Sequence, residues 1–208
     1  MPKYFLILIF VLLSGCMNTN DEVKESEESQ ETNNTEVKAQ AESTGNYDEP
    51  IIKDEREAVT PAKLSIPAID VEAEVEQAGV DEKGRMGVPD GSENVAWFEP
   101  GTKPGAAGNS VMAGHVDDTV NPAVFYNLHK LKEGDEVSVQ NKDGKTLTFE
   151  VTGKEVYGFK DAPMEEIFGY THRSALNLVT CYGDYVGDTT RREDRLVVYT
   201  QLKSESSD

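Results

Sequence analysis

Short apolar runs, separated by turn-forming residues, recur along residues 61–202. Residues 71–76 alternate apolar and acidic side chains, which is typical of a strand with one face buried and the other in water. Asp143 and Gly144 separate two further runs and form a strong signal for a tight β-hairpin. The predicted strands cover residues 63–67, 71–76, 84–88, 94–98, 109–115, 136–140, 146–157, 175–181 and 195–201.

Two segments have helical rather than strand spacing. Apolar side chains recur at helical intervals over residues 124–131, and this segment ends before Gly134, a natural stop. A second short helix is expected over residues 164–168. No unit of about 20–50 residues repeats, so a repeat architecture is excluded. Many short strands with minor helices predict an all-β fold, a closed or nearly closed barrel of about eight strands.

Residues 1–15 differ from the rest of the chain in being mostly apolar. Lys3 supplies a positive start, residues 4–13 are an unbroken apolar run, and small residues precede Cys16. Such a run is too short to cross a hydrocarbon core of about 30 Å as a helix, but it suits an export signal. Because its end resembles a bacterial lipobox, we expect residues 1–15 to be a lipoprotein signal peptide and Cys16 to carry the lipid. The alternative is a plain secretory signal cleaved nearby, with Cys16 incidental.

Residues 16–60 are polar and rich in acidic side chains, most densely over residues 21–31. Such a segment buries too little apolar surface to offset the entropy of ordering the chain, and its like charges repel one another. We therefore expect a lipid-anchored, disordered linker, followed by the globular domain over residues 61–203 and a short tail over residues 204–208. The linker either holds the domain away from the membrane or simply keeps it soluble.

The whole chain is acidic, with a formal net charge of −19 and a pI near 4.5. Nucleic acids and anionic lipid headgroups are bound by clusters of Lys and Arg, and the sequence has none, so neither partner is expected. The chain has 2 cysteines, which excludes a disulfide framework beyond one possible bridge. If Cys16 is lipidated, Cys181 has no partner, and a lone cysteine in an exported protein is often a reactive thiol.

Three of the apolar runs carry a chemically active side chain at one end. His115 and Cys181 each close a run, and Arg195 opens one. A thiol, an imidazole and a guanidinium are what cysteine-based acyl transfer requires: a nucleophile, a proton shuttle and a donor to an oxyanion. A guanidinium keeps its protons, so Arg195 can donate hydrogen bonds but cannot act as a base. We therefore predict these three roles for Cys181, His115 and Arg195.

Competing assignments exist for the thiol and the imidazole. Cys181 can instead be a buried structural cysteine, which is common for this residue type. His129 lies within the predicted helix and is expected at the surface, whereas His172 lies in the loop before the cysteine strand. His115 is preferred because the neighbouring Gly114 lets the backbone approach closely.

Arg191 and Arg192 compete with Arg195, but we expect them to be solvated in a polar loop and paired with nearby acids. That loop, residues 182–194, is long and rich in Gly and Asp, so it is either a functional lid or a flexible excursion. Together with residues 159–172, it is expected to shape a groove around the site.

Metal and cofactor binding are not expected. Asp117 and Asp118 come nearest to a calcium site, but their spacing is not that of a recognised calcium loop. We expect both carboxylates to be solvated charges, and we expect neither a metal ion nor a cofactor.

Four motifs occur in order along the globular part: Ala113-Gly114-His115, Phe125…Leu128…Leu131-Lys132-Glu133-Gly134-Asp135, Leu178-Val179-Thr180-Cys181 and Arg195-Leu196-Val197-Val198-Tyr199. Leu64-Ser65-Ile66-Pro67 and Val124-Phe125 add to the pattern. In this order the motifs resemble those of the sortases, and most closely class F, a group of exported bacterial transpeptidases. The resemblance implies an eight-stranded barrel in which the histidine, cysteine and arginine meet at one end of a groove. Many sortases are held by an uncleaved transmembrane helix, so the lipoprotein-type signal departs from that pattern.

The resemblance also implies an activity. Cys181 would attack a Thr–Gly-like bond in an LPxTG-like sorting signal and form a thioester, which an amine would resolve. Ala113, Val179 and Thr180, beside the active residues, are the expected substrate contacts. Expected partners are exported proteins with a C-terminal sorting signal and an amine on a cell-wall precursor or a pilin, at the extracytoplasmic face of the membrane. A thiol peptidase that only hydrolyses, and a surface lipoprotein whose barrel binds a ligand, remain the alternatives.

Overall fold

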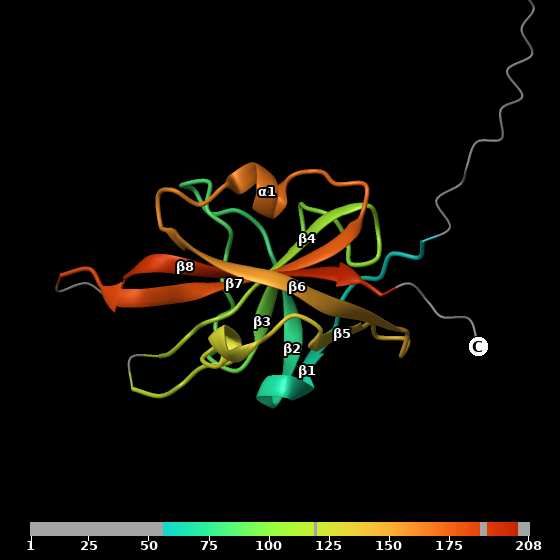
Figure 1. The fold of residues 1–208 in the computed structure, drawn as a ribbon, viewed down its shortest axis with the longest axis horizontal. Coiled ribbons are helices and arrows are strands. Elements are labelled where there is room, and N and C mark those ends of the chain that lie inside the picture. The colour runs from blue at the N-terminus through green and yellow to red at the C-terminus, as the bar shows by residue number, and fades with distance from the viewer. Residues whose placement is uncertain (1–55, 119, 188–190, 204–208) are drawn as a thin grey trace, which may run out of the picture. The chain divides into compact units, whose positions relative to one another are not determined.

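Eight strands form a closed barrel in the computed structural model, which describes residues 56–118, 120–187 and 191–203 (Figure 1). The strands follow one another around the barrel in the order β1-β2-β3-β4-β7-β8-β6-β5, and β5 pairs with β1 to close it. All neighbours are antiparallel except β2–β3 and β4–β7, which are parallel. The strands are β1 Lys63–Ile66, β2 Val71–Ala78, β3 Val95–Phe98, β4 Gly108–Ala113, β5 Glu136–Gln140, β6 Thr146–Gly158, β7 Ser174–Tyr185 and β8 Arg192–Leu202. The helices are η1 Pro67–Ile69, η2 Leu128–Lys130 and α1 Met164–Phe168.

The interior of the barrel is filled by apolar side chains from every strand. Leu64, Val139, Phe149, Leu176 and Val198 are among those with no exposed surface. Burying a large apolar side chain completely contributes about 1.5–3 kcal/mol, so this packed interior is the main source of stability. The all-β barrel predicted from the strand pattern is confirmed.

A second apolar cluster lies on the outer side of β4, β7 and β8. We call it the outer cluster: Val111, Ile167 and Val197, with Met86, Phe98, Phe168 and Val179 packed against them. Helix α1 covers this side (Figure 1), and the side-chain amides of Asn109 and Asn177 hold it by donating to the carbonyls of Glu166 (2.9 Å) and Ile167 (2.8 Å). The central strands are therefore buried on both faces, which explains why they read as continuous apolar runs rather than alternating ones.

Two local predictions are wrong, and each has a clear physical reason. Residues 84–88 form no strand, because the Asp81 carboxylate accepts hydrogen bonds from the backbone of Lys83 and Arg85 and closes a turn. The expected helix over residues 124–131 contains only the short 3-10 helix η2. Its apolar residues are spaced by three, which is the period of a 3-10 helix rather than an α-helix. Those residues, Phe125, Leu128 and Leu131, are fully buried.

The segment expected to be a long loop is a β-hairpin. Strands β7 and β8 stay paired as far as Tyr185 and Arg192, and the hairpin projects from the barrel at the left of Figure 1. Residues 182, 184, 185, 187, 191 and 193 of this extension are exposed, so the segment carries no apolar period. This explains why residues 182–194 resemble a loop in sequence.

The predicted signal peptide, Cys16, most of the linker and the tail over residues 204–208 lie outside the described residues. The described end of the linker packs against the barrel: Val59 is buried, and its N–H donates to the carbonyl of Pro104 (2.8 Å). The packed domain therefore begins slightly before residue 61. Within the described parts of the chain, no helix is both long enough and apolar enough to cross a membrane.

Candidate active site

Cys181 and Arg195 are direct neighbours on adjacent strands, and His115 follows the third strand, β4, by two residues; we call these three residues the active row. Cys181 pairs directly with Arg195 in the antiparallel β7–β8 ladder. In the parallel β4–β7 ladder Ala113 pairs with Val179, and continuing this register by two residues brings His115 beside Cys181. Neighbouring strands are about 4.8 Å apart, so the row spans roughly 10 Å of backbone. The structure therefore pairs Cys181 with Arg195, and the register of β4 with β7 leads towards His115, two residues beyond the last pair.

The ladder continues beyond the end of β4 through two hydrogen bonds. The N–H of Gly114 donates to the carbonyl of Val179 (3.1 Å), and the hydroxyl of Thr180 donates to the carbonyl of Gly114 (2.8 Å). These bonds hold the residue before His115 against the residue before Cys181. These bonds therefore fix the backbone just before His115 against β7.

The side chains of Cys181 and Arg195 lie on the outer face of the barrel. Along β7, Leu178 belongs to the interior and Val179 to the outer cluster, so Cys181 falls on the outer side with Val179. Along β8, Leu196 is interior, and Arg195 is on the outer side. Cys181 is a free, half-buried thiol. It is therefore not a cysteine sealed in the core.

His115 is held by the segment between β2 and β3. Its Nε2 lies 3.0 Å from the carbonyl oxygen of Pro89. A carbonyl oxygen only accepts, so Nε2 carries a proton and donates it, and Nδ1 is the ring nitrogen left for proton exchange in the neutral form. Nothing in the sequence points to this partner, because Pro89 is 26 residues from His115 along the chain.

Glycine is the only residue type that fits at position 114, directly before His115. A Cβ atom at this position would lie 2.7 Å from the Phe125 ring and 2.8 Å from the Val124 side chain. The small neighbour expected from sequence is therefore needed for packing, since the segment that follows β4 folds back over the glycine. The N–H of Phe125 donates to the carbonyl of His115 (2.9 Å), which closes this turn.

Arg195 is anchored through its Nη1 and its ring contact. Nη1 donates to the carbonyls of Asp194 (2.7 Å) and Arg192 (3.3 Å). The guanidinium carbon lies 4.7 Å from the centre of the Phe159 ring, within the range of a cation–π interaction. The same planar guanidinium also carries N–H donors on Nε and Nη2, in addition to those on Nη1. Phe159, which sequence patterns did not single out, is thus a neighbour of the row.

The competing histidines lie elsewhere. His172 precedes β7, whose first residue, Ser174, lies roughly 23 Å along the strand from Cys181 at about 3.3 Å per residue. Its Nδ1 lies 3.3 Å from the hydroxyl of Tyr170, and its carbonyl accepts from Arg56. His129 is exposed on η2, with Nδ1 3.0 Å from the carbonyl of Tyr126. Only His115 among the three shares the row.

Arg192 is not solvated, contrary to expectation. It pairs with Asp117, and each of the two side chains is only 20 % exposed, so Asp117 is not a solvated charge either. Asp118 is exposed, and backbone N–H donors from Asn121 and Val120 lower the pKa of its carboxyl. The described residues contain no group of three or more His, Cys, Asp or Glu placed to hold a metal ion.

A pocket of about 390 Å³ opens at the same end of the barrel. From β7 it is lined by Thr180 and Tyr182, which alternate with Cys181 and face the other way. Thr180 is buried, and its hydroxyl is engaged by the carbonyl of Gly114. Val179 and Ala113 are instead paired with each other on the outer face. They precede Cys181 and His115 by two residues each.

Comparison with known proteins points to one family. The family model of the sortase domain matches residues 64–203. Among solved structures, a sortase D5 transpeptidase from Clostridium perfringens is similar, with 25 % identity, 69 % of this chain and 79 % of that chain covered, and a TM-score of 0.52. Sortase C-1 from Actinomyces oris shares 24 % identity over 70 % of this chain and 74 % of its own, with a TM-score of 0.54.

Sortase A from Corynebacterium diphtheriae has the same fold, with 24 % identity, 75 % of this chain and 66 % of that chain covered, and a TM-score of 0.55. No curated protein sequence matches. The family model spans most of the chain and the whole barrel, including the row of His115, Cys181 and Arg195. The chain therefore belongs to the sortase family.

Proposed function

We propose that this protein is a class F-type sortase that cleaves an LPxTG-like sorting signal and transfers the acyl group to an amine. The observation that supports the proposal is the direct pairing of Cys181 with Arg195, next to a β4–β7 register whose continuation by two residues would place His115 on the other side of Cys181. A nucleophile between a proton carrier and a permanently charged donor suits acyl transfer through a covalent intermediate.

In the first half of the reaction, the sulfur of Cys181 attacks the carbonyl carbon of the Thr–Gly-like bond. A carbon–sulfur bond forms as the thiol proton of Cys181 passes to Nδ1 of His115, and the carbon–nitrogen bond breaks as His115 passes that proton to the leaving amine. With Nε2 held by Pro89, Nδ1 is the nitrogen that serves this exchange. The acyl group is left as a thioester on Cys181.

In the second half, an incoming amine attacks the thioester carbon and gives its proton to His115. The carbon–sulfur bond breaks, and the thiol is restored. In both halves a negative charge develops on the carbonyl oxygen, and the guanidinium of Arg195 donates hydrogen bonds to it. Removing such a donor typically lowers the rate by about 100- to 1,000-fold.

The outer face supports binding of an extended peptide beside the row. Ala113 and Val179 are the expected contacts, and partly buried members of the outer cluster such as Met86 and Phe98 offer apolar surface for the apolar residues of the signal. Thr180 contributes indirectly, because its hydroxyl holds Gly114. Partners of this kind are exported proteins with a C-terminal sorting signal and an amine on a cell-wall precursor or pilin.

The proposal includes a lipid anchor on Cys16 and an acidic linker that extends from the outer face of the cell membrane. Both features rest on the sequence of residues 1–60. Labelling growing cells with a palmitate analogue, in parallel with Cys16→Ala, tests the anchor. Label in the unchanged protein and none in the variant supports lipidation, whereas equal label in both contradicts it.

A ligand-binding barrel is disfavoured because the interior is already filled by fully buried side chains. The decisive experiment is to trap the intermediate. The purified protein is mixed with an LPxTG peptide, quenched in acid and analysed by mass spectrometry. We expect an acyl adduct on Cys181 that is missing in Cys181→Ala.

The same reaction mixture distinguishes transfer from hydrolysis. Addition of oligoglycine or diaminopimelate should yield a ligated product and clear the adduct. An adduct that yields only hydrolysed peptide would identify a thiol peptidase. If no adduct forms and Cys181→Ala turns over the peptide like the unchanged protein, the proposal is wrong.

A further inference from the structure

A polar network joins the segment after His115 to the β7–β8 hairpin. Arg192 opens β8 and pairs through Nη2 with the carboxylate of Asp117. The same carboxylate accepts from the hydroxyl of Tyr185 at 3.1 Å and 3.2 Å, and Nη1 of Arg192 donates to the carbonyl of Gly183 (2.5 Å). The guanidinium also lies 4.3 Å from the centre of the Tyr185 ring. We call these four residues the Arg192 network.

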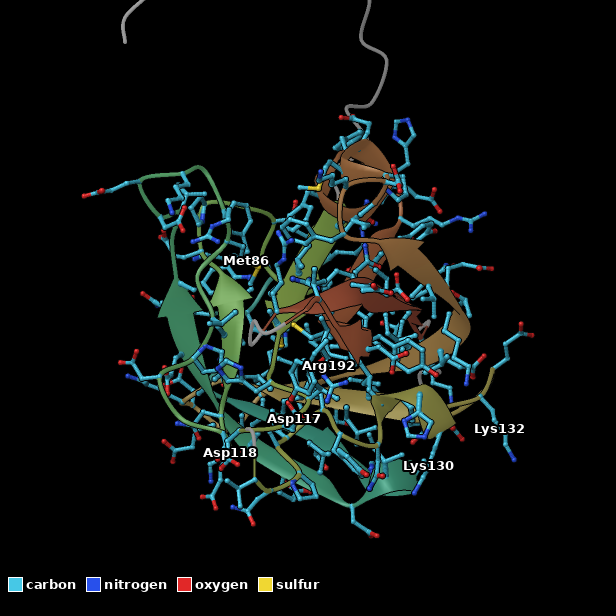
Figure 2. All side chains as sticks on the ribbon, turned by 90° about the vertical axis from the view of Figure 1, so that its left-hand side faces the viewer. Met86, Asp117, Asp118, Lys130, Lys132 and Arg192 are labelled. Carbon is cyan, nitrogen blue, oxygen red and sulfur yellow. The ribbon has the colours of Figure 1, made fainter. Side chains whose placement is uncertain are left out.

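The network lies at the end of the barrel that bears the active row. Figure 2 views this end, and the labelled side chains of Asp117 and Arg192 come together near its centre. Asp117 is separated in sequence by 75 residues from Arg192, so the contact depends on the closed barrel. Burial lowers the pKa of Arg192, but the carboxylate of Asp117 more than offsets this and leaves it raised.

Each member of the network is close in sequence to one residue of the active row. Asp117 follows His115 by two residues, and Gly183 follows Cys181 by two. The carbonyl of Arg192 accepts from Nη1 of Arg195 (3.3 Å). One guanidinium therefore connects the chain segments that carry the imidazole, the thiol and the second guanidinium.

Two backbone hydrogen bonds of residues 116–123 are made within this segment. The N–H of Asp118 donates to the carbonyl of Asn121, and the N–H of Ala123 donates to that of Val116, both at 3.1 Å. Bonds of this kind shape the segment but do not tie it to β7 or β8. Asp117 supplies that connection through Arg192 and Tyr185.

We infer that the Arg192 network is a positioning device that locks the segment carrying His115 against the β7–β8 hairpin and so sets the geometry of the imidazole around Cys181. The inference rests on the proposed function, in which His115 exchanges protons with the substrate amines. Arg192 is a positioning residue, because it acts through the backbone of others. Arginine suits the task, since its planar group contacts the carboxylate, a carbonyl and a ring together, which a lysine cannot.

A purely structural role predicts something different. A network that only stabilised the hairpin would lower the melting temperature when broken and leave turnover of the folded protein unchanged. A positioning role predicts a lower kcat in protein that is still folded, with little change in KM. Displacing a catalytic group by about 1 Å can reduce the rate about 100-fold.

The test compares Asp117→Asn, Arg192→Gln and the double variant in the full chain, with the LPxTG peptide and an amine acceptor. We expect kcat to fall about 10- to 100-fold in each single variant, with KM within about threefold. The kcat of the double variant should be no lower than that of the less active single variant, because both changes break the same contact. Arg192→Lys keeps the charge but loses the planar group, so kcat should recover only in part.

Lys203→Gln is the matched control. It removes a surface pair with Glu136 near the other end of β8, where both side chains are about half exposed. Melting curves show that each variant is folded at the assay temperature; for any that is not, Arg192→Lys and Tyr185→Phe decide the outcome by the same criterion. If the unchanged protein is active and folded Asp117→Asn and Arg192→Gln match its kcat, the inference is wrong while the proposed function stands. If the unchanged protein forms no adduct, the proposed function itself fails.

Discussion

Cys181 and Arg195 face each other as direct partners in the β7–β8 ladder. This pairing fixes the guanidinium on the same outer face as the thiol, whatever the rotamer of either side chain, because paired residues share a face of the sheet. The parallel pairing of β4 with β7 adds His115 on the other side. The order histidine, cysteine, arginine is therefore a property of the backbone.

Arg195→Ala should lower kcat/KM by about 100- to 1,000-fold, because the oxyanion loses its charged donor. The measurement is peptide cleavage with saturating amine. Arg191→Ala is the matched control, since Arg191 also stacks on Phe159, at 5.1 Å, but is outside the row. Equal losses in the two variants would show that stacking on Phe159, rather than position in the row, explains the effect.

Phe159→Ala should lower kcat/KM by about two- to fivefold. The loss corresponds to a cation–π interaction of about 0.5–1 kcal/mol that holds the guanidinium of Arg195. Phe159→Trp keeps an aromatic face and should retain most of the activity. Identical kinetics for Phe159→Ala and the unchanged protein would mean that the ring does not orient Arg195.

Gly114→Ala should lower the free energy of unfolding by about 1–3 kcal/mol, because the new Cβ overlaps Phe125 and Val124. Activity should fall as well, since relief of the overlap moves the adjacent His115. Urea denaturation followed by tryptophan fluorescence measures the stability. Gly153→Ala, where a Cβ meets nothing within 4 Å, is the control, and a similar loss there would contradict the steric explanation.

Asp81 should titrate far below an ordinary aspartate. Hydrogen bonds from the side chain and backbone of Arg85, and from the N–H of Lys83, lower its pKa to about 2. Folding therefore favours the carboxylate, and this contribution to stability is present above pH of about 4 and lost as the pH falls through about 2. NMR titration of the carboxyl carbon should show the low midpoint. In Arg85→Gln it should rise part of the way towards 4, and an unchanged midpoint would rule out Arg85 as the main cause.

Strand positions were largely predictable from sequence, because apolar and polar side chains alternate along a half-buried strand. Prediction failed where this alternation is missing or misleading. Beyond the barrel the β7–β8 hairpin is largely exposed, so residues 182–194 have the composition of a loop. Residues 84–88 have strand-like composition, but the carboxylate of Asp81 folds the chain into a turn before them.

For the site, the sequence by itself identified three reactive side chains next to apolar runs: His115, Cys181 and Arg195. Their expected places at strand ends were wrong, because β7 extends four residues past Cys181, β8 begins three residues before Arg195, and His115 lies two residues beyond the end of β4. Only the tertiary structure decided that β4 and β8 flank β7, that Pro89 holds the imidazole, and that Asp117 meets Arg192. The physical reason is that hydrophobic periodicity reports whether a residue is buried but not which distant segment buries it. That choice is made when the barrel closes and each strand acquires its neighbours.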